Sequence, residues 1–260
     1  MTTTAVPHES RGHYRFSQVA RMEWIKLRSL RSTWWTLTLT VAGAVAIAVA
    51  VGANTKDAAA DLTNNVLAGT SLGLLLSGAV GVLAMTSEYS SGMIRATLAA
   101  IPNRPLALAA KAAVVGAVTF AAGEGASFVA FLAGRAAMPA TVPAPSLGQP
   151  GVLRAVMLGG AGFCLIGLIG LGLGAIIRHS GAAIAVLVGG VYLAAQFVAL
   201  VAHSIMPYLP VAIVANSLTV VRPIVDPIRF LSPWAGLGVL SLEAAVTLAA
   251  GAWLLARRDA

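Results

Sequence analysis

The stretch "VLAGTSLGLLLSGAVGVLAMTSEYSSGMIRATLAAIPNRP", residues 66–105, joins a long apolar run to a polar segment. Its first part, 66–86, is long enough to cross the roughly 30 Å hydrocarbon core of a membrane as a helix. Its second part, 87–105, carries helix start and stop signals of its own, where a bare turn would connect its neighbours. The stretch therefore predicts a membrane span followed by a structured loop.

The composition extends this prediction to the whole chain. Hydrophobic residues make up 58% of the 260 residues, and charged residues only 10%. Soluble domains have roughly 45–50% and roughly 25%, respectively. The apolar runs are continuous, whereas the strands of a membrane barrel alternate. We therefore expect an all-α fold, that of a polytopic membrane protein.

Six apolar stretches of membrane length divide the chain into an N-terminal part, a six-helix transmembrane domain at 33–256 and a short tail at 257–260. The stretches lie near 33–53, 66–86, 107–134, 153–177, 181–203 and 233–256. Segment 205–232 is apolar but broken by prolines, which is typical of a re-entrant segment covered by protein, and we expect it outside the cell.

The N-terminal part, 1–32, is predicted to contain an amphipathic interfacial helix before the first span. Phe16, Ala20, Trp24 and Leu27 recur at helical spacing, with cationic residues elsewhere around the helix. Such a helix places its apolar side in the lipid and its cations toward anionic headgroups.

The distribution of basic residues predicts the orientation of the spans. With both termini on one side, twelve of the 17 Lys and Arg residues fall on that side. The other five are Lys56, Arg135, Arg154, Arg222 and Arg229. The positive-inside rule then places both termini in the cytoplasm. The net charge of +8 is therefore explained by membrane orientation and does not call for a nucleic-acid partner.

Two smaller features belong to the same cytoplasmic side. "RHSG", residues 178–181, is predicted to form a tight turn between the fourth and fifth spans. Lys111, near the start of the third span, is expected to extend its ammonium to the headgroups.

The polar segment is predicted to contain a short helix over 92–101, with Ser90 and Ser91 as N-cap candidates and Pro102 as its end. One face carries the apolar side chains. It consists of Ile94, Leu98 and Ile101, with Met93 and Thr97 beside them and Arg95 off the face. An exposed apolar face favours a docking surface, and the membrane, another part of this chain or a soluble partner would each provide one.

These residues also carry a resemblance to a known family. The segment is similar to the loop between the second and third spans of permeases of the type 2 ATP-binding-cassette (ABC) transporters, of the actinobacterial kind. The matching positions are Glu88, Tyr89, Gly92, Thr97, Leu98, Pro102, Arg104 and Lys111. The "GAIIRHSGAAIAV" turn, the "SPWAGL" opening of the last span and the "RRDA" tail extend the likeness over most of the chain.

The resemblance implies the membrane subunit of an exporter in a bacterial plasma membrane. In such permeases the short loop helix, called the coupling helix, rests on a separate ATP-binding subunit, and two permeases, identical or related, join two ATPases. Met93, Ile94, Thr97, Leu98 and Ile101 would then dock this subunit, with Glu88, Arg95 and Arg104 making polar contacts. ATP and Mg would be bound by the partner, since no phosphate-loop motif occurs in this sequence. We expect Glu88 to pair with Arg28, Arg31 or Arg104.

Two carboxylates lie within predicted spans, Glu124 and Glu243, where a charge costs at least about 2.5 kcal/mol. With Gln196 they are candidates for a substrate path, and protonated carboxyls bonded across helix interfaces are the structural alternative. A stand-alone secondary transporter that uses Glu124 and Glu243, or a non-transporting assembly or immunity protein, remains a competing reading.

The single cysteine, Cys164, and the spacing of the four histidines predict no disulfide, metal site or catalytic site, so neither an enzyme nor a bound cofactor is expected in this chain.

Overall fold

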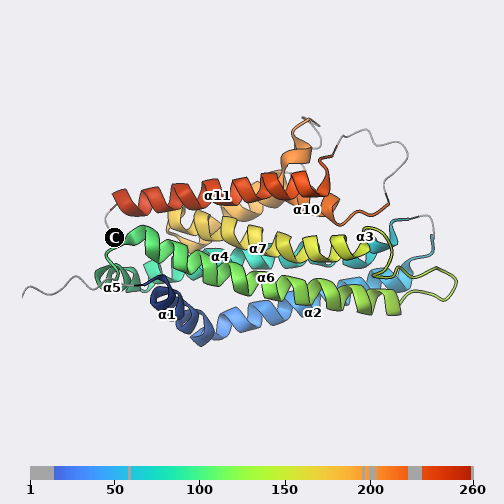
Figure 1. Cartoon of the computed structure of the whole chain (residues 1–260), viewed down its shortest axis with the longest axis horizontal. Helices are drawn as coiled ribbons and strands as arrows, with labels where there is room; N and C mark the ends of the chain where they lie inside the picture. The colour runs from blue at the N-terminus through green and yellow to red at the C-terminus, as the bar shows by residue number, and fades with distance from the viewer. Residues whose placement is uncertain are drawn as a thin grey trace, which may run out of the picture.

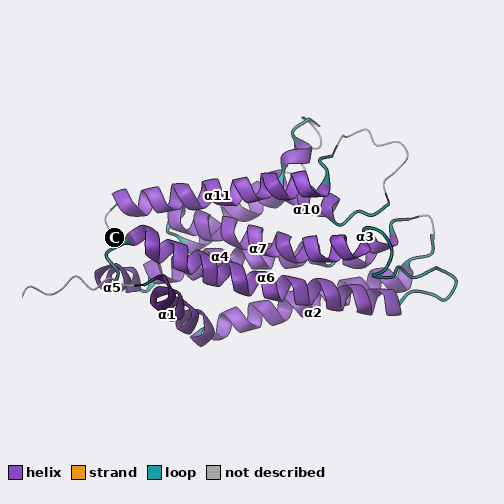
Figure 2. Ribbon diagram, in the orientation of Figure 1, coloured by secondary structure: helices purple, strands orange, loops and turns teal. Residues whose placement is uncertain are grey.

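The computed structural model describes residues 15–57, 60–194, 197–198, 202, 204–221 and 230–258. Within these ranges every regular element is a helix (Figures 1 and 2). The elements are α1 (Phe16–Ser29), α2 (Arg31–Asn54), α3 (Leu62–Leu67), α4 (Thr70–Ser90), α5 (Met93–Ala100), α6 (Arg104–Ala136), α7 (Val152–Ile177), α8 (Ser180–Leu187), the π-helix η1 (Val188–Leu193), the 3-10 helix η2 (Met206–Tyr208), α10 (Pro210–Ser217) and α11 (Pro233–Arg257). The predicted all-helical class is confirmed for the described part.

Five helical segments among the described residues are long and apolar enough to cross a membrane, judged by length and composition. They are Arg31–Asn54, Leu62–Ser90, Arg104–Ala136, Val152–Ile177 and Pro233–Arg257. They correspond to five of the six predicted spans. The sixth, 181–203, is described as a shorter apolar helix over Ser180–Leu193, and its remainder includes residues outside the described ranges.

Helix α7 lies at the centre of the bundle, against α4, α6 and α11. Its contact with α4 depends on glycine, because the two backbones meet directly. A Cβ on Gly81 would overlap the carbonyl oxygen of Gly167, and one on Gly170 would overlap the carbonyl of Gly78. A Cβ on Gly174 would lie 3.0 Å from the carbonyl oxygen of Val82 in the same helix pair. Glycines at these positions therefore allow the close packing of α4 and α7.

Helix α1 meets the spans at one end of the bundle, which it shares with α5 and the last turn of α11 (Figure 1). We call this the α5 end, and the opposite end, with α3, the α3 end. The predicted apolar face of α1 is divided in two. Phe16 and Trp24 are exposed, while Leu27 is buried with Val19 and Glu23. One stripe of α1 thus packs on α6, and the neighbouring stripe points away from the protein.

The predicted tight turn between the fourth and fifth spans is present. Arg178 ends α7 with a left-handed backbone, φ 63°. The Nδ1 atom of His179 then accepts a hydrogen bond from the backbone N–H of Ala182 and caps α8.

Near the α3 end, the segment after η1 folds back over the bundle. Of the predicted segment 205–232, the structure describes η2, α10 and the residues to 221 and from 230. Ile213 and Val214 of α10 are buried in the core, and α10 packs on α7 and α11. One side of α10 is thus covered by protein, whereas Ile205, Tyr208 and Val221 in the same segment are exposed.

Candidate functional site

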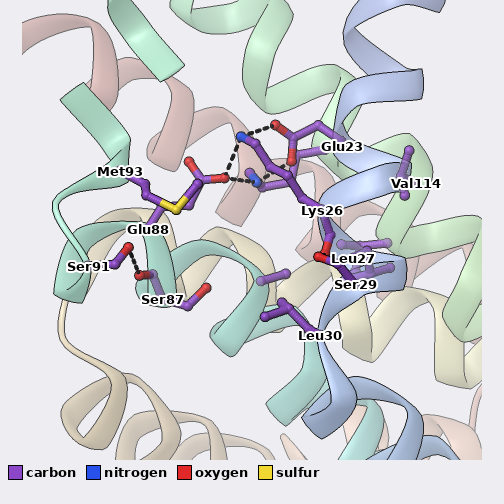
Figure 3. Close-up of a pocket in the computed structure, with 13 residues that line it drawn as sticks. Glu23, Lys26, Leu27, Ser29, Leu30, Ser87, Glu88, Ser91, Met93 and Val114 are labelled. Atoms are coloured by element: carbon purple, nitrogen blue, oxygen red, sulfur yellow. Dashed lines mark hydrogen bonds and ion pairs between the residues drawn. The ribbon is translucent and has the colours of Figure 1, made fainter. Parts of the chain in front are cut away.

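Four ionisable side chains meet inside the bundle at the α5 end. They are Glu23 and Lys26 of α1, Glu88 of α4 and Lys111 of α6, and we call them the polar cluster. Glu88 Oε1 lies 2.9 Å from Lys26 Nζ and 2.7 Å from Lys111 Nζ. Glu23 Oε1 lies 3.0 Å from Lys26 Nζ, and Glu23 Oε2 also pairs with Lys111 Nζ. Figure 3 shows these pairs as dashed lines.

The cluster is buried and electrically balanced. The side chains of Glu23, Glu88 and Lys111 are 4%, 6% and 8% exposed, and that of Lys26 is 22% exposed. Buried charges are stable only when paired and hydrogen-bonded. Two carboxylates and two ammonium groups satisfy this requirement together, and each cation contacts both anions. The cluster therefore joins three helices that are far apart in the sequence.

Local structure places each member. Glu23 lies four residues after Val19 and four before Leu27, so it belongs to the stripe of α1 that packs on the bundle. Lys26 lies one turn further along the same helix. Glu88 lies in the last turn of α4, and Lys111 in the third turn of α6. Glu88 and Lys111 thus come from the two helices that flank α5 in the chain.

Lys26 also holds α5. Its Nζ donates to Thr97 Oγ1 of α5 at 3.0 Å. Burial alone would lower the pKa of Lys26, but its hydrogen bonds to Glu88 and Glu23 and their negative charge outweigh burial, so the pKa is raised above its ordinary value. Lys26 is therefore a charged link between α1, α4 and α5.

The turn that leads into α5 depends on Gly92. This residue has φ 72°, in the left-handed region that glycine enters without steric cost. Ser90 and Ser91, predicted as N-caps of the short helix, instead donate their hydroxyls to the carbonyl of Ser87 at the end of α4. Helix α4 continues through Ser90, so the N-cap position of α5 falls on Gly92.

The structure covers most of the predicted docking residues with this chain itself. Ile94 and Ile101 are 5% and 3% exposed, and Thr97 is buried beside the polar cluster. Leu98 is half-buried against the same core, and only Met93 of the set is exposed. Of the three docking surfaces considered, another part of this chain is the one that the apolar face occupies. Ile94, Thr97 and Ile101 are therefore not available to a partner in this conformation.

The polar partners predicted for this region also require correction. Glu88 pairs with Lys26 and Lys111, not with Arg28, Arg31 or Arg104. Lys111 does not extend to the headgroups, since it is buried between two carboxylates.

Arg104 and Arg95 have different surroundings. Arg104 Nη1 donates to the carbonyls of Leu255 and Arg258 at 2.8 and 3.0 Å, and so binds the end of α11, where helix carbonyls lack partners. Arg95 is exposed on α5.

The carboxylates of the predicted spans lie away from the polar cluster. Glu124 follows Lys111 by thirteen residues on α6, about 20 Å along a helix. Its carboxyl group packs on Gly160 of α7. Among the described residues, no group donates to either oxygen of Glu124 or to Oε2 of Glu243. Gln196 lies outside the described residues.

Glu23, Lys26 and Lys111 were not predicted as site residues. Glu23 carried a signal, because a carboxylate in the middle of an apolar stripe at i and i+4 spacing needs a buried cation. The ion pairs themselves left no signal in the sequence, since Lys26 and Glu88 are 62 residues apart and Glu23 and Lys111 are 88 residues apart.

A cavity of about 250 Å³ adjoins the polar cluster (Figure 3). In the part of the chain that the structure describes, no three His, Cys, Asp or Glu side chains gather as metal ligands would. Comparison with models of protein families finds no match, and comparison with curated proteins finds no relative.

Proposed function

We propose that this chain is the membrane-spanning permease subunit of an ATP-driven exporter, with α5 as the helix that couples it to a separate ATP-binding subunit. The observation that carries the proposal is the attachment of α5. This eight-residue helix is anchored on its inner side by Ile94 and Thr97 and leaves its outer side exposed. The exposed residues are Met93, Arg95, Ala96, Ala99 and Ala100.

This geometry supports the transmission of motion from α5 to the spans. A partner that pushes on the outer side of α5 also moves the polar cluster, because Thr97 is bonded to Lys26. Ion pairs in a poorly solvated site cannot separate without a large free-energy cost, so α1, α4 and α6 would move with α5. ATP binding by the partner would then favour one of two packings of the spans.

The finer topology belongs to the same proposal. The α5 end, which carries most of the basic residues, would face the cytoplasm of a bacterial cell, with both termini. Residues 181–203 would complete six spans. Two permeases, identical or related, would assemble with two ATP-binding subunits that hold ATP and Mg, and substrate would pass between the permeases.

A stand-alone transporter is the second candidate. The observation that favours it is Glu124, whose two buried oxygens lack donors among the described residues. In this alternative Glu124 and Glu243 would bind the coupling ion, and no ATP-binding partner would contact α5.

Photo-crosslinking distinguishes the two candidates. A photoreactive residue at Ala99, on the outer side of α5, is expected to form adducts with a soluble subunit that contains a phosphate-loop motif, in the membranes of cells that make the protein. Adducts are identified by mass spectrometry.

The matched control is the same photoreactive residue at Ala144, which is exposed in the loop between α6 and α7. It should give no adduct with that subunit. Adducts with lipid alone at both positions would contradict the proposed coupling role and leave the second candidate.

A further inference from the structure

An open groove lies on the outside of the bundle, where α1 meets α2 and α6. Its volume is about 630 Å³, larger than the roughly 150 Å³ of a cavity known to hold benzene. Apart from Thr38, its walls are aliphatic or aromatic. They include Trp24 of α1, Trp34, Leu37 and Val41 of α2, and Val118 and Ala121 of α6. The groove therefore suits an apolar chain better than a polar molecule.

The groove extends along α2. Trp34 and Ala42 both line it, and the eight residues between these two positions extend about 12 Å along a helix. The hydrocarbon of one membrane leaflet is about 15 Å deep, half of the whole core. The groove therefore matches most of the depth that an acyl chain crosses in one leaflet.

Helix α1 marks the end of the groove that would lie at the membrane surface. Figure 1 views α1 nearly along its axis, whereas α2 and α6 run across the picture. Helix α1 thus crosses the direction of the spans, as an interfacial helix does. Trp34 Nε1 donates to the carbonyl of Arg28 at 3.0 Å, which holds the indole beside α1. Tryptophans favour the headgroup level, so this end of the groove would lie there.

Three exposed cations surround this end. Arg21 and Arg28 lie one turn before and one turn after Trp24, and Arg31 is the first residue of α2. No described carboxylate pairs with these arginines. Glu23, the one acidic residue of α1 and α2, is bonded within the polar cluster. Since guanidinium groups match phosphate oxygens with several N–H donors, the apolar groove ends at an accessible site for phosphate.

We propose that this groove binds an anionic phospholipid of the bilayer, with one acyl chain against Leu37, Val41 and Val118 and its phosphate between Arg21 and Arg28. A zwitterionic phospholipid has the same chains, but the cation of its headgroup would be repelled by the arginines. The site requires α2 and α6 to lie in a bilayer and is independent of an ATP-binding subunit. A failed crosslink at Ala99 would therefore not affect it.

The test compares two lipids that share their acyl chains and differ in headgroup charge. The full chain in detergent micelles is titrated with dioleoyl phosphatidylglycerol or dioleoyl phosphatidylcholine, and native mass spectrometry measures the fraction that carries one lipid. The wild type should bind the anionic lipid about tenfold more tightly, because arginines near the membrane surface attract anionic headgroups. Equal affinity for the two lipids would overturn the proposal.

A pair of double variants locates the headgroup. Arg21→Gln/Arg28→Gln removes both cations and should lower the preference for phosphatidylglycerol to less than about threefold. Arg15→Gln/Arg95→Gln removes the same charge from exposed positions on α5 and before α1, and should retain the preference. An equal loss in both double variants would indicate an effect of net charge alone and would overturn the site.

A second pair of variants locates the acyl chain. Ala121→Phe fills the groove and should weaken binding of phosphatidylglycerol about tenfold, whereas Ala249→Phe, at an exposed position on α11 toward the α5 end, should not change it. Unchanged lipid binding in Ala121→Phe, with its fold intact by circular dichroism, would overturn the proposal. Loss of a dimer in the same spectra, without loss of bound lipid, would assign the groove to a second copy of the chain instead.

Discussion

At the scale of single residues, the polar cluster is constrained by its charge balance. Each of its cations contacts both of its anions, so no member can be removed without leaving a buried charge poorly compensated. Such a network contributes little net stability compared with apolar residues of the same volume, but it fixes which helices pair. Here it determines how α1 lies against α4 and α6.

Replacement of Lys111 by methionine tests this balance. Lys111→Met leaves two buried carboxylates with Lys26 as their one cation in the cluster, and we expect it to lower the free energy of unfolding by about 3–5 kcal/mol. The double variant Glu88→Gln/Lys111→Met retains the balanced pair of Glu23 and Lys26 and should recover part of the loss. Reversible unfolding in mixed micelles measures both.

The control is Arg95→Met, which removes an exposed cation from α5 and should change the free energy of unfolding by less than about 0.5 kcal/mol. If Lys111→Met and Arg95→Met have the same effect, the network has no structural role.

Sequence reasoning about single residues succeeded for backbone features and failed for buried charges. Residues 178–181 were predicted to form a tight turn because a Ser and a Gly follow Arg and His between two apolar runs, and Arg178 and His179 form that turn. Lys111 was assigned to the headgroups because a lysine near a span end commonly extends there. Its true partners, Glu23 and Glu88, come from two other helices, and spacing along the chain holds no information about them.

At the scale of elements, α5 is defined by its boundaries. Pro102 and Asn103 follow it, and Gly92 turns the chain sharply away from α4. The sequence predicted a short amphipathic helix at 92–101, and α5 occupies Met93–Ala100. What it could not predict is the surface that the apolar face meets, because a lipid, a partner or the chain itself would select the same pattern.

Substitution of Gly92 by alanine tests the turn. Nothing lies within 4 Å of an added Cβ, so the cost comes from the left-handed backbone alone. We expect Gly92→Ala to lower the free energy of unfolding by about 1–2 kcal/mol. Gly92→Asn should cost less, since asparagine enters this region more readily. Thermal unfolding followed by circular dichroism gives both values.

Gly125→Ala is the comparison within a helix. This site on α6 is also open to an added Cβ but has ordinary helical backbone, so alanine should stabilise by about 0.5–1 kcal/mol. An equal effect of alanine at Gly92 and Gly125 would argue against strain at the turn.

Across the whole molecule, the sequence predicted which segments form helices better than how these helices pack together. Continuous apolar runs predicted six spans, and five helices of membrane length are present among the described residues, because hydropathy reports burial from water directly. The central place of α7 was not predicted. Every span is apolar all round, so hydropathy does not distinguish a face toward lipid from a face toward protein.

The arrangement in Figure 1 makes a further prediction about sidedness. Met93 lies at the α5 end, while Ala144 lies in the loop between α6 and α7, beyond the α3 end of both helices. In a background with Cys164 replaced by serine, a membrane-impermeant maleimide should label Ala144→Cys in intact cells. It should label Met93→Cys only in inside-out vesicles, because α6 would cross the membrane between the two positions.

Arg257→Cys, at the end of α11, should be labelled from the same side as Met93→Cys, since Arg104 binds the last carbonyls of that helix. Labelling of Met93→Cys and Ala144→Cys from the same side would mean that α6 does not span the membrane, and the placement of α5 in the cytoplasm would fail with it.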